Sequence, residues 1–175
     1  MNHIQSKLRA FTLVELLIVV TIIGIASALV VPYVGARTDL RVSAVARTLI
    51  SDLQYAQNLA ITTRQSHGIW FEANRYTIQR FSTGGATTIK HPVSKDTFVV
   101  QMGPTGKDVY SGIAMPLVNV RQGASRLVFD SMGTPMAFDG TTSISTTSAA
   151  LVSLSAGGTT IVIRIEPFTG EVNVE

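Results

Sequence analysis

The chain has 175 residues, of which 46% are hydrophobic and only 14% are charged, and its formal net charge is +3. This length leaves room for one apolar segment and one modest globular domain. The small positive charge does not indicate a nucleic-acid-binding protein. The absence of cysteine excludes a disulfide framework, thiolate chemistry and a cysteine-based metal site.

The first predicted element is an apolar segment from Phe11 to Val31, which follows a short basic stretch containing Lys7 and Arg9. As a helix it would extend about 32 Å, enough to cross the roughly 30 Å hydrocarbon core of a bilayer. Glu15 lies near its start. An unpaired carboxylate in hydrocarbon costs roughly 2.5–3.5 kcal/mol at mid-membrane and less near the edge, so this residue requires an explanation.

Three interpretations of residues 1–33 are open from the residues alone. An ordinary signal peptide would be cut after Ala26-Ser27-Ala28, which matches the small-x-small cleavage pattern. A plain membrane anchor would keep its N-terminus at Met1. A prepilin leader would be cut before Phe11, and the apolar segment would stay on the mature chain.

The stretch "KLRAFTLVELLIVV" resembles the processing and assembly signal of type IV pilins and type II secretion pseudopilins. A basic leader ends in the small residue Ala10, and Phe11 and then Glu15 follow. The resemblance implies cleavage by a prepilin peptidase between Ala10 and Phe11, methylation of the new amino group on Phe11, and a bend of the helix at Pro32. The family usually has Gly where this chain has Ala10.

The physical chemistry of Glu15 agrees with this resemblance. Cleavage after Ala10 would create a charged amino group on Phe11, close to the membrane edge. When subunits pack side by side, Glu15 of one subunit can face the Phe11 ammonium of a neighbour. A buried carboxylate is tolerated when a cation pairs with it. We therefore expect Glu15 to direct filament assembly.

An amphipathic helical pattern continues beyond Pro32, and neither Gly nor Pro occurs between Ala36 and Ser66. Its apolar residues recur at spacings of three and four, which is typical of a helix with one buried face. They are Val42, Val45, Ala46, Leu49, Leu53, Ala56 and Ala60. We predict a long helix that ends near Arg64 and packs on the chain's own β-domain rather than in a coiled coil.

From residue 67 the apolar period changes to two, which indicates β-strands. We predict a hairpin over 67–81 that turns at Ala73-Asn74, and further strands over 97–102 and within 125–138. A strand in "ALVSLSA" is predicted to lead through an Ala-Gly-Gly turn into a strand over 159–165, and a short final strand follows. Residues 82–96 and 139–148 are predicted to be loops. The aromatic residues of these strands, among them Trp70, Phe71, Tyr76, Phe81 and Phe98, are predicted to lie in the core.

This order of elements predicts an α+β fold, in which a long N-terminal helix with a transmembrane first half packs on a C-terminal antiparallel β-domain. The resemblance makes this architecture pilin-like. The predicted organisation is a leader peptide (1–10), a transmembrane and filament-core helix (11–33), its amphipathic continuation (34–66) and the β-domain (67–175).

The sequence predicts no catalytic, cofactor-binding or metal-binding residues, and so no enzyme. His67 and His91 have no second ligand at metal-binding spacing, "GPTGKD" lacks the spacing of a phosphate loop, and no G-x-S-x-G motif occurs. The best basic cluster is interpreted as a solvated hairpin edge, so DNA is not expected as a partner. Its members are Arg75, Arg80, Lys90 and Lys95.

The stretches "DLQYAQNLAITTRQ", "LVFDSMGTP" and "RIEPFTGEVNVE" extend the resemblance to the general secretion pathway protein H and FimT group of minor pseudopilins. This implies a structural subunit in the bacterial inner membrane, with one membrane pass and a periplasmic C-terminal domain. The implied partners are other pilins or pseudopilins, the prepilin peptidase and the secretion assembly platform. A FimT-type pilin that binds DNA for uptake, and a β-domain protein with an ordinary signal sequence, remain the alternatives.

Overall fold

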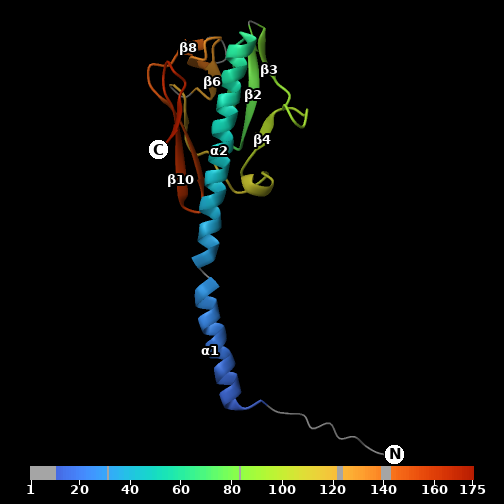
Figure 1. Ribbon diagram of the computed structural model, residues 1–175, viewed down its shortest axis with the longest axis vertical. Helices are drawn as coiled ribbons and strands as arrows, with labels where there is room; N and C mark the ends of the chain where they lie inside the picture. Colours follow the sequence, from blue (N-terminus) through green and yellow to red (C-terminus); the bar gives the residue numbers. More distant parts are fainter. Residues whose placement is uncertain (1–10, 31, 83, 122–123, 139–142) are drawn as a thin grey trace, which may run out of the picture. The chain divides into compact units, whose positions relative to one another are not determined.

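The computed structural model describes residues 11–30, 32–82, 84–121, 124–138 and 143–175, including their side chains except for 28–30 and 32–37 (Figure 1). The chain divides into two compact units, residues 1–37 and 38–175.

The first unit contains helix α1, Leu13–Val30, which is built almost entirely from aliphatic residues. Helix α2, Pro32–Thr63, begins at the end of this unit and lies mostly in the second. Residue 31 lies outside the described residues. The bend at Pro32 therefore stays a prediction.

The amphipathic character predicted for α2 is confirmed. All seven residues of the predicted apolar stripe are at most 2% exposed. The helix ends at Thr63, as expected, and the next residue, Arg64, has a φ of 52°. A residue in the left-handed region cannot continue a right-handed helix, and it commonly terminates one.

Two antiparallel sheets form the rest of the second unit. The larger, seven-stranded sheet has the order β3-β2-β1-β6-β7-β8, and β4 also pairs with β2. Its strands are β1 (His67–Glu72), β2 (Arg75–Ser82), β3 (Gly85–Thr88), β4 (Val99–Gln101), β6 (Arg126–Phe129), β7 (Pro135–Phe138) and β8 (Ser143–Ser145). The smaller sheet has the order β11-β10-β9-β5. Its strands are β5 (Val118–Asn119), β9 (Ala150–Ala156), β10 (Thr159–Ile165) and β11 (Val172–Val174), and a short 3-10 helix, Asp108–Tyr110, precedes β5.

The predicted hairpin is confirmed, since β1 and β2 pair on either side of Ala73-Asn74 with Glu72 opposite Arg75. The two predicted loops were wrong in part. Strand β3 forms within 82–96 and β8 within 139–148, and β5 was not expected. These strands are only two to four residues long, so they are too short to show a clear period of two. The neighbouring strands β2, β7 and β9 supply their hydrogen-bonding partners.

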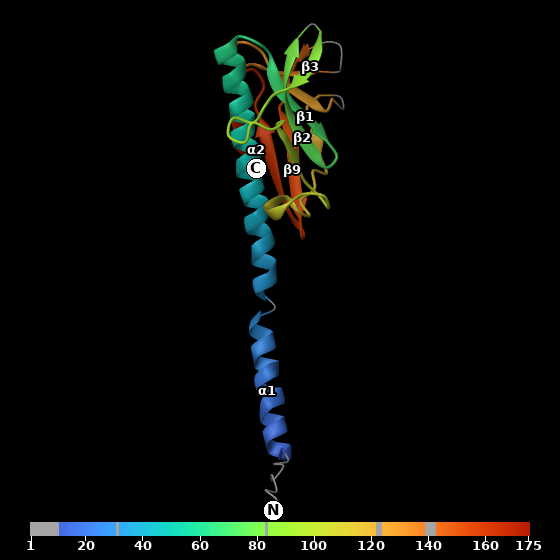
Figure 2. The same cartoon turned by 90° about the vertical axis from the view of Figure 1, so that its right-hand side faces the viewer.

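The core of the second unit lies between α2 and the two sheets. Figure 2 shows α2 running along one side of strands β1, β2 and β9. The apolar stripe of α2 forms one buried cluster with side chains of both sheets, including Ile69, Ile78 and Leu154. Four of the five aromatic residues assigned to the core are at most 7% exposed. The fifth, Trp70, is half-buried and stacks on Arg126, whose guanidinium carbon lies 4.8 Å from the ring centre.

One polar side chain of α2 joins the helix to turns of both sheets. The amide nitrogen of Gln57 donates hydrogen bonds to the carbonyl oxygen of Gly133, in the β6–β7 turn, at 2.9 Å and to that of Thr169, in the β10–β11 turn, at 3.0 Å. Because both acceptors are backbone atoms, this contact fixes where the two turns sit on the helix. It was not visible in the sequence.

Candidate functional site

The start of α1 is organised by Thr12. The hydroxyl oxygen of Thr12 accepts a hydrogen bond from the backbone N–H of Glu15 at 3.2 Å, and its carbonyl oxygen accepts one from the N–H of Leu16 at 3.1 Å. This is the geometry of an N-cap residue, which satisfies a backbone donor that would otherwise have no partner. The sequence reasoning missed Thr12, although Thr-x-x-Glu is a known signature of a helix start.

Glu15 occupies the first turn of α1, where its side chain is exposed. A negative charge at this position is favoured by the partial positive charge of the helix N-terminus, typically by about 0.3–1 kcal/mol. Glu15 therefore has a local role in the helix, and any role in assembly would be additional to it.

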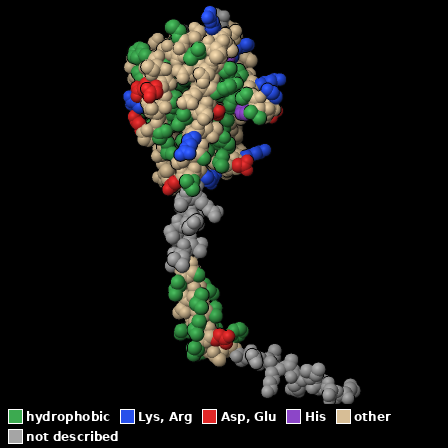
Figure 3. Space-filling view, viewed as in Figure 1, with side chains coloured by type: hydrophobic (Ala, Val, Ile, Leu, Met, Phe, Trp, Pro, Cys, Tyr) green, Lys and Arg blue, Asp and Glu red, His purple; other side chains and the backbone are tan. Residues whose placement is uncertain are grey.

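The surface of α1 is apolar on every side. Figure 3 shows hydrophobic side chains along the visible face of the helix and one acidic side chain near its start. The large exposed residues are Leu13, Val14, Leu16, Leu17, Ile18, Val19, Val20, Ile22, Ile23 and Ile25, each at least 47% exposed. A helix that is hydrophobic all round is normally buried in a protein assembly or in a membrane.

Two polar residues of α1 are adapted to such surroundings. The hydroxyl of Thr21 donates to the carbonyl oxygen of Ile18 at 2.8 Å, and that of Ser27 donates to the carbonyl oxygen of Ile23 at 2.7 Å. Each hydroxyl proton is thus satisfied within the helix, which lowers the cost of an apolar environment.

Among the residues that the structure describes, no helix combines the length and the apolar character needed to cross a membrane.

The site residues predicted at the N-terminus are only partly described. Ala10 lies outside the described residues, and Phe11, the first described residue, is 77% exposed. Glu15 lies in the first turn of α1, and Pro32 is the first residue of α2. The roles predicted for these four residues stay predictions.

The predicted basic cluster is not a single cluster. Arg75 begins β2 and Arg80 lies near its end, so about 16 Å of strand separates them at roughly 3.3 Å per residue. Arg75 is also paired with Glu72, with Nη2 2.8 Å from Oε1. The ammonium group of Lys95 donates to the carbonyl oxygen of Pro92 at 2.7 Å. This arrangement does not favour a DNA-binding surface over a solvated edge.

A buried polar contact joins α2 to β2. The hydroxyl of Tyr76, which is fully buried, donates a hydrogen bond to Oδ2 of Asp52 at 2.6 Å. Burial raises the pKa of Asp52 above its usual value, and the bond from Tyr76 and the charge of His91 offset part of this effect. Burial and the neighbouring carboxylate also raise the pKa of Tyr76 well above its usual value. The pair is a structural contact, because its two groups satisfy each other inside the domain.

This contact predicts a pH-dependent effect of Asp52→Asn. Because the folded-state pKa of Asp52 is raised, its contribution to stability is full below the unfolded value near 3.8 and is lost as the pH rises through the folded value. The asparagine cannot ionise, yet its oxygen can still accept the bond from Tyr76. We therefore expect Asp52→Asn to be more stabilising, or less destabilising, at pH 7 than at pH 3, as measured by urea unfolding followed through Trp70 fluorescence.

Tyr76→Phe is the companion variant. It deletes the donor and leaves the half-buried Asp52 without this partner, so we expect a loss of about 1–3 kcal/mol of unfolding free energy at pH 7. An equal effect of Asp52→Asn at both pH values would contradict the assigned direction of the pKa shift.

Comparisons with known proteins agree with this site and fold. The family model described as the prokaryotic N-terminal methylation motif matches residues 6–31, which include Ala10, Phe11 and Glu15. No curated protein matches the chain. The solved structure of the minor pseudopilin EpsH from the type 2 secretion system of Vibrio cholerae is similar, with a TM-score of 0.54 and 14% identity over 77% of this chain and 96% of that chain. The type IV minor pilin FimU of Pseudomonas aeruginosa PAO1 matches with a TM-score of 0.49 and 16% identity, over 77% of this chain and 87% of that chain.

The fold is therefore that of a pilin-like protein, in which a helix packs on an antiparallel β-domain, as predicted. Residues 6–31 also carry the prokaryotic N-terminal methylation motif, so the motif and the fold both resemble those of type IV pilins and pseudopilins.

Proposed function

We propose that the chain is a minor pseudopilin, a structural subunit of a type II secretion filament or a related type IV pilus-like filament. A prepilin peptidase cuts between Ala10 and Phe11, and the new amino group of Phe11 is methylated. The observation that supports this most is the combination of a helix that is apolar on every side with one carboxylate in its first turn, inside the residues that match the methylation motif.

The proposed assembly uses α1 in two environments. Before assembly, α1 anchors the chain in the bacterial inner membrane, with the domain that follows on the periplasmic side. In the filament, the α1 helices of other pilins or pseudopilins cover the same apolar surface. Burying such side chains stabilises association by roughly 25 cal/mol per Å² of apolar area removed from water. The secretion assembly platform is the proposed site where the chain moves from membrane to filament.

Glu15 sets the register of this packing. Its carboxylate faces the methylated ammonium group of Phe11 on a neighbouring subunit, so each charge is paired only when the helices align correctly. A buried charge is tolerated when it is paired and is strongly destabilising when one partner is missing. The exposed domain, residues 38–175, makes the contacts that distinguish one neighbouring subunit from another.

The mature N-terminus tests this proposal directly. We expect N-terminal sequencing and mass spectrometry of the chain from bacterial membranes to find N-methylated Phe11. An N-terminus at Leu29 would indicate an ordinary signal peptide, and one at Met1 a plain anchor; either result would overturn the proposal.

A matched pair of variants strengthens this experiment. Ala28→Leu removes the small residue that an ordinary signal peptidase needs, and should leave the cut at Phe11 unchanged. Ala10→Gly restores the residue usual in the superfamily, and the fraction of cleaved chain should be equal or greater.

A further inference from the structure

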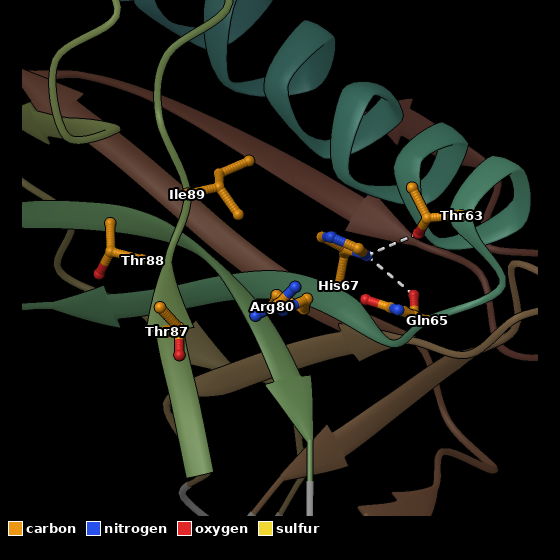
Figure 4. Close-up of a pocket in the computed structure, with 7 residues that line it drawn as sticks. All are labelled: Thr63, Gln65, His67, Arg80, Thr87, Thr88 and Ile89. Carbon is orange, nitrogen blue, oxygen red and sulfur yellow. Dashed lines mark hydrogen bonds between the residues drawn. The ribbon is translucent and has the colours of Figure 1, made fainter. Parts of the chain in front are cut away.

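A cavity of about 290 Å³ lies at the end of α2, against strands β1, β2 and β3 (Figure 4). Its lining consists of Thr63, Gln65, His67, Arg80, Thr87, Thr88 and Ile89. All of these residues belong to the second unit, far in the sequence from the methylation motif. The assembly role proposed above does not use this cavity.

Three of the lining residues form a row across three paired strands. His67 of β1 lies opposite Arg80 of β2, and Arg80 lies opposite Thr87 of β3. Directly opposed residues in antiparallel strands project from the same face of the sheet. This register brings an imidazole, a guanidinium and a hydroxyl together on one face. Figure 4 shows them with Thr63 and Gln65 from the end of the helix and its loop.

His67 offers an acceptor to this cavity. Its side chain is 4% exposed, and its Nδ1 lies 2.8 Å from the carbonyl oxygen of Gln65. A carbonyl oxygen can only accept, so Nδ1 carries the proton and Nε2 of the neutral ring is an acceptor. No described residue hydrogen-bonds to Nε2. A hydroxyl group on a ligand can donate to this nitrogen in place of solvent water.

Arg80 offers a positive charge. Among the described residues no carboxylate pairs with it, and none of the residues that line the cavity is acidic. The hydroxyl of Thr87 and the side-chain amide of Gln65 provide further donors beside it. A guanidinium group binds carboxylate or phosphate through two parallel hydrogen bonds, so this part of the cavity suits an anion.

The end of α2 opposes an anion only weakly. Carbonyl groups at a helix C-terminus carry partial negative charge. The full positive charge of Arg80 outweighs this partial charge.

We propose that this cavity binds an anionic sugar, that is, a sugar carrying one phosphate or carboxylate group. The anionic group binds Arg80 and the hydroxyl of Thr87, a sugar hydroxyl donates to Nε2 of His67, and Ile89 contacts the C–H face of the ring. The size fits, because about 290 Å³ is roughly twenty times the ~10–15 Å³ that a cavity needs to hold one water molecule. An inorganic anion alone would leave most of this space to water.

The test is a titration of the ¹⁵N-labelled full-length chain in detergent micelles, followed by amide chemical shifts. The two anionic sugars tested are glucose 6-phosphate and glucuronate. Glucose is the control for a sugar that carries no charge, and sulfate is the control for an anion that is not a sugar. We expect at least one anionic sugar to give saturable shifts at residues 65, 67, 80 and 87. Glucose and sulfate should bind at least tenfold more weakly. The anionic sugar that binds more tightly identifies phosphate or carboxylate as the preferred group.

Variants locate the site. Arg80→Gln should weaken binding of the anionic sugar by roughly tenfold or more, since a hydrogen bond to a charged group is lost. Thr87→Val should weaken it several-fold. Arg75→Gln removes the same charge from the same strand outside the cavity, and should leave binding unchanged.

The proposal is overturned if neither anionic sugar gives saturable shifts, or if Arg80→Gln and Thr87→Val both bind as well as the unchanged chain. If sulfate binds as tightly as the anionic sugars, the cavity is a simple anion site, and the proposal is overturned as well. If a single-stranded DNA oligomer shifts the same amides more strongly than either sugar, the cavity belongs to a nucleic-acid-binding surface and the sugar proposal is overturned.

Discussion

Glu15→Gln should reduce incorporation of the chain into its filament at least about tenfold while leaving the cut at Phe11 intact. Glutamine is close in shape to glutamate but carries no charge, so the Phe11 ammonium of the neighbouring subunit would lose its counter-ion. Leaving one charge of a buried pair without its partner typically costs about 3–5 kcal/mol, and less where water reaches the pair. A tenfold effect corresponds to only about 1.4 kcal/mol, so it is a conservative expectation.

The contacts at the start of α1 allow an effect of the lost charge to be distinguished from a loss of helical structure. The hydroxyl of Thr12 bonds to the backbone N–H of residue 15, which any substitution there other than proline retains. Glutamine also suits the capping position three residues after Thr12. The variant should therefore keep α1 intact, and circular dichroism of the purified chain in detergent can verify this.

The measurement is the fraction of the variant recovered with sheared or cross-linked filaments, relative to the total amount in the membrane. Glu15→Ala should behave like Glu15→Gln. Thr21→Val, which removes a hydroxyl already bonded inside α1, is the control and should assemble normally. Normal incorporation of Glu15→Gln would show that the carboxylate serves only the helix N-terminus.

Gly68→Ala should destabilise the second unit by about 3 kcal/mol or more, which is beyond the usual range for adding one methyl group. Gly68 lies in β1, where it pairs with Gln79 of β2 on one side and Val128 of β6 on the other. A Cβ atom at this position would lie 2.1 Å from the carbonyl oxygen of Leu127 and 2.6 Å from the Cα of Val128. Both neighbours are backbone atoms of a paired strand, so neither can move aside without breaking the sheet.

Urea unfolding of the full-length chain in detergent, followed by the fluorescence of Trp70, measures this effect. Trp70 is the single tryptophan and lies in the same strand. Gly84→Ala is the matched control, because its Cβ would meet only the side chain of Ser82 at 4.0 Å. We expect the control to change stability by less than about 0.5 kcal/mol. A Gly68→Ala chain as stable as this control would show that β1 and β6 are not so closely paired.

Local patterns in the sequence predicted the elements that depend on near neighbours. The stripe from Val42 to Ala60 predicted the buried face of α2, because a spacing of three and four places side chains on one side of a helix. Alternation predicted the β1–β2 hairpin in the same way. The prediction of a helix on an antiparallel β-domain followed from the order of these elements.

Such local patterns could not predict contacts between residues that are far apart in the sequence. Asp52 and Tyr76 are both unremarkable in sequence, yet the packing of α2 on β2 joins their side chains inside the domain. Gln57 contacts two turns more than 75 residues away. Strand β3 was predicted to be loop because four residues, Gly85–Thr88, carry little propensity, and their pairing with β2 decided their structure.

The sequence alone determined the apolar helix, its acidic first turn, the amphipathic continuation and the change to strands, since each depends on side chains a few residues apart. The tertiary structure alone decided which strands pair and in what register. Register determines which side chains share a face, because shifting a strand by one residue turns every side chain to the opposite side. His67, Arg80 and Thr87 therefore carry no joint signal in the sequence, and only the pairing of β1, β2 and β3 brings them into one cavity.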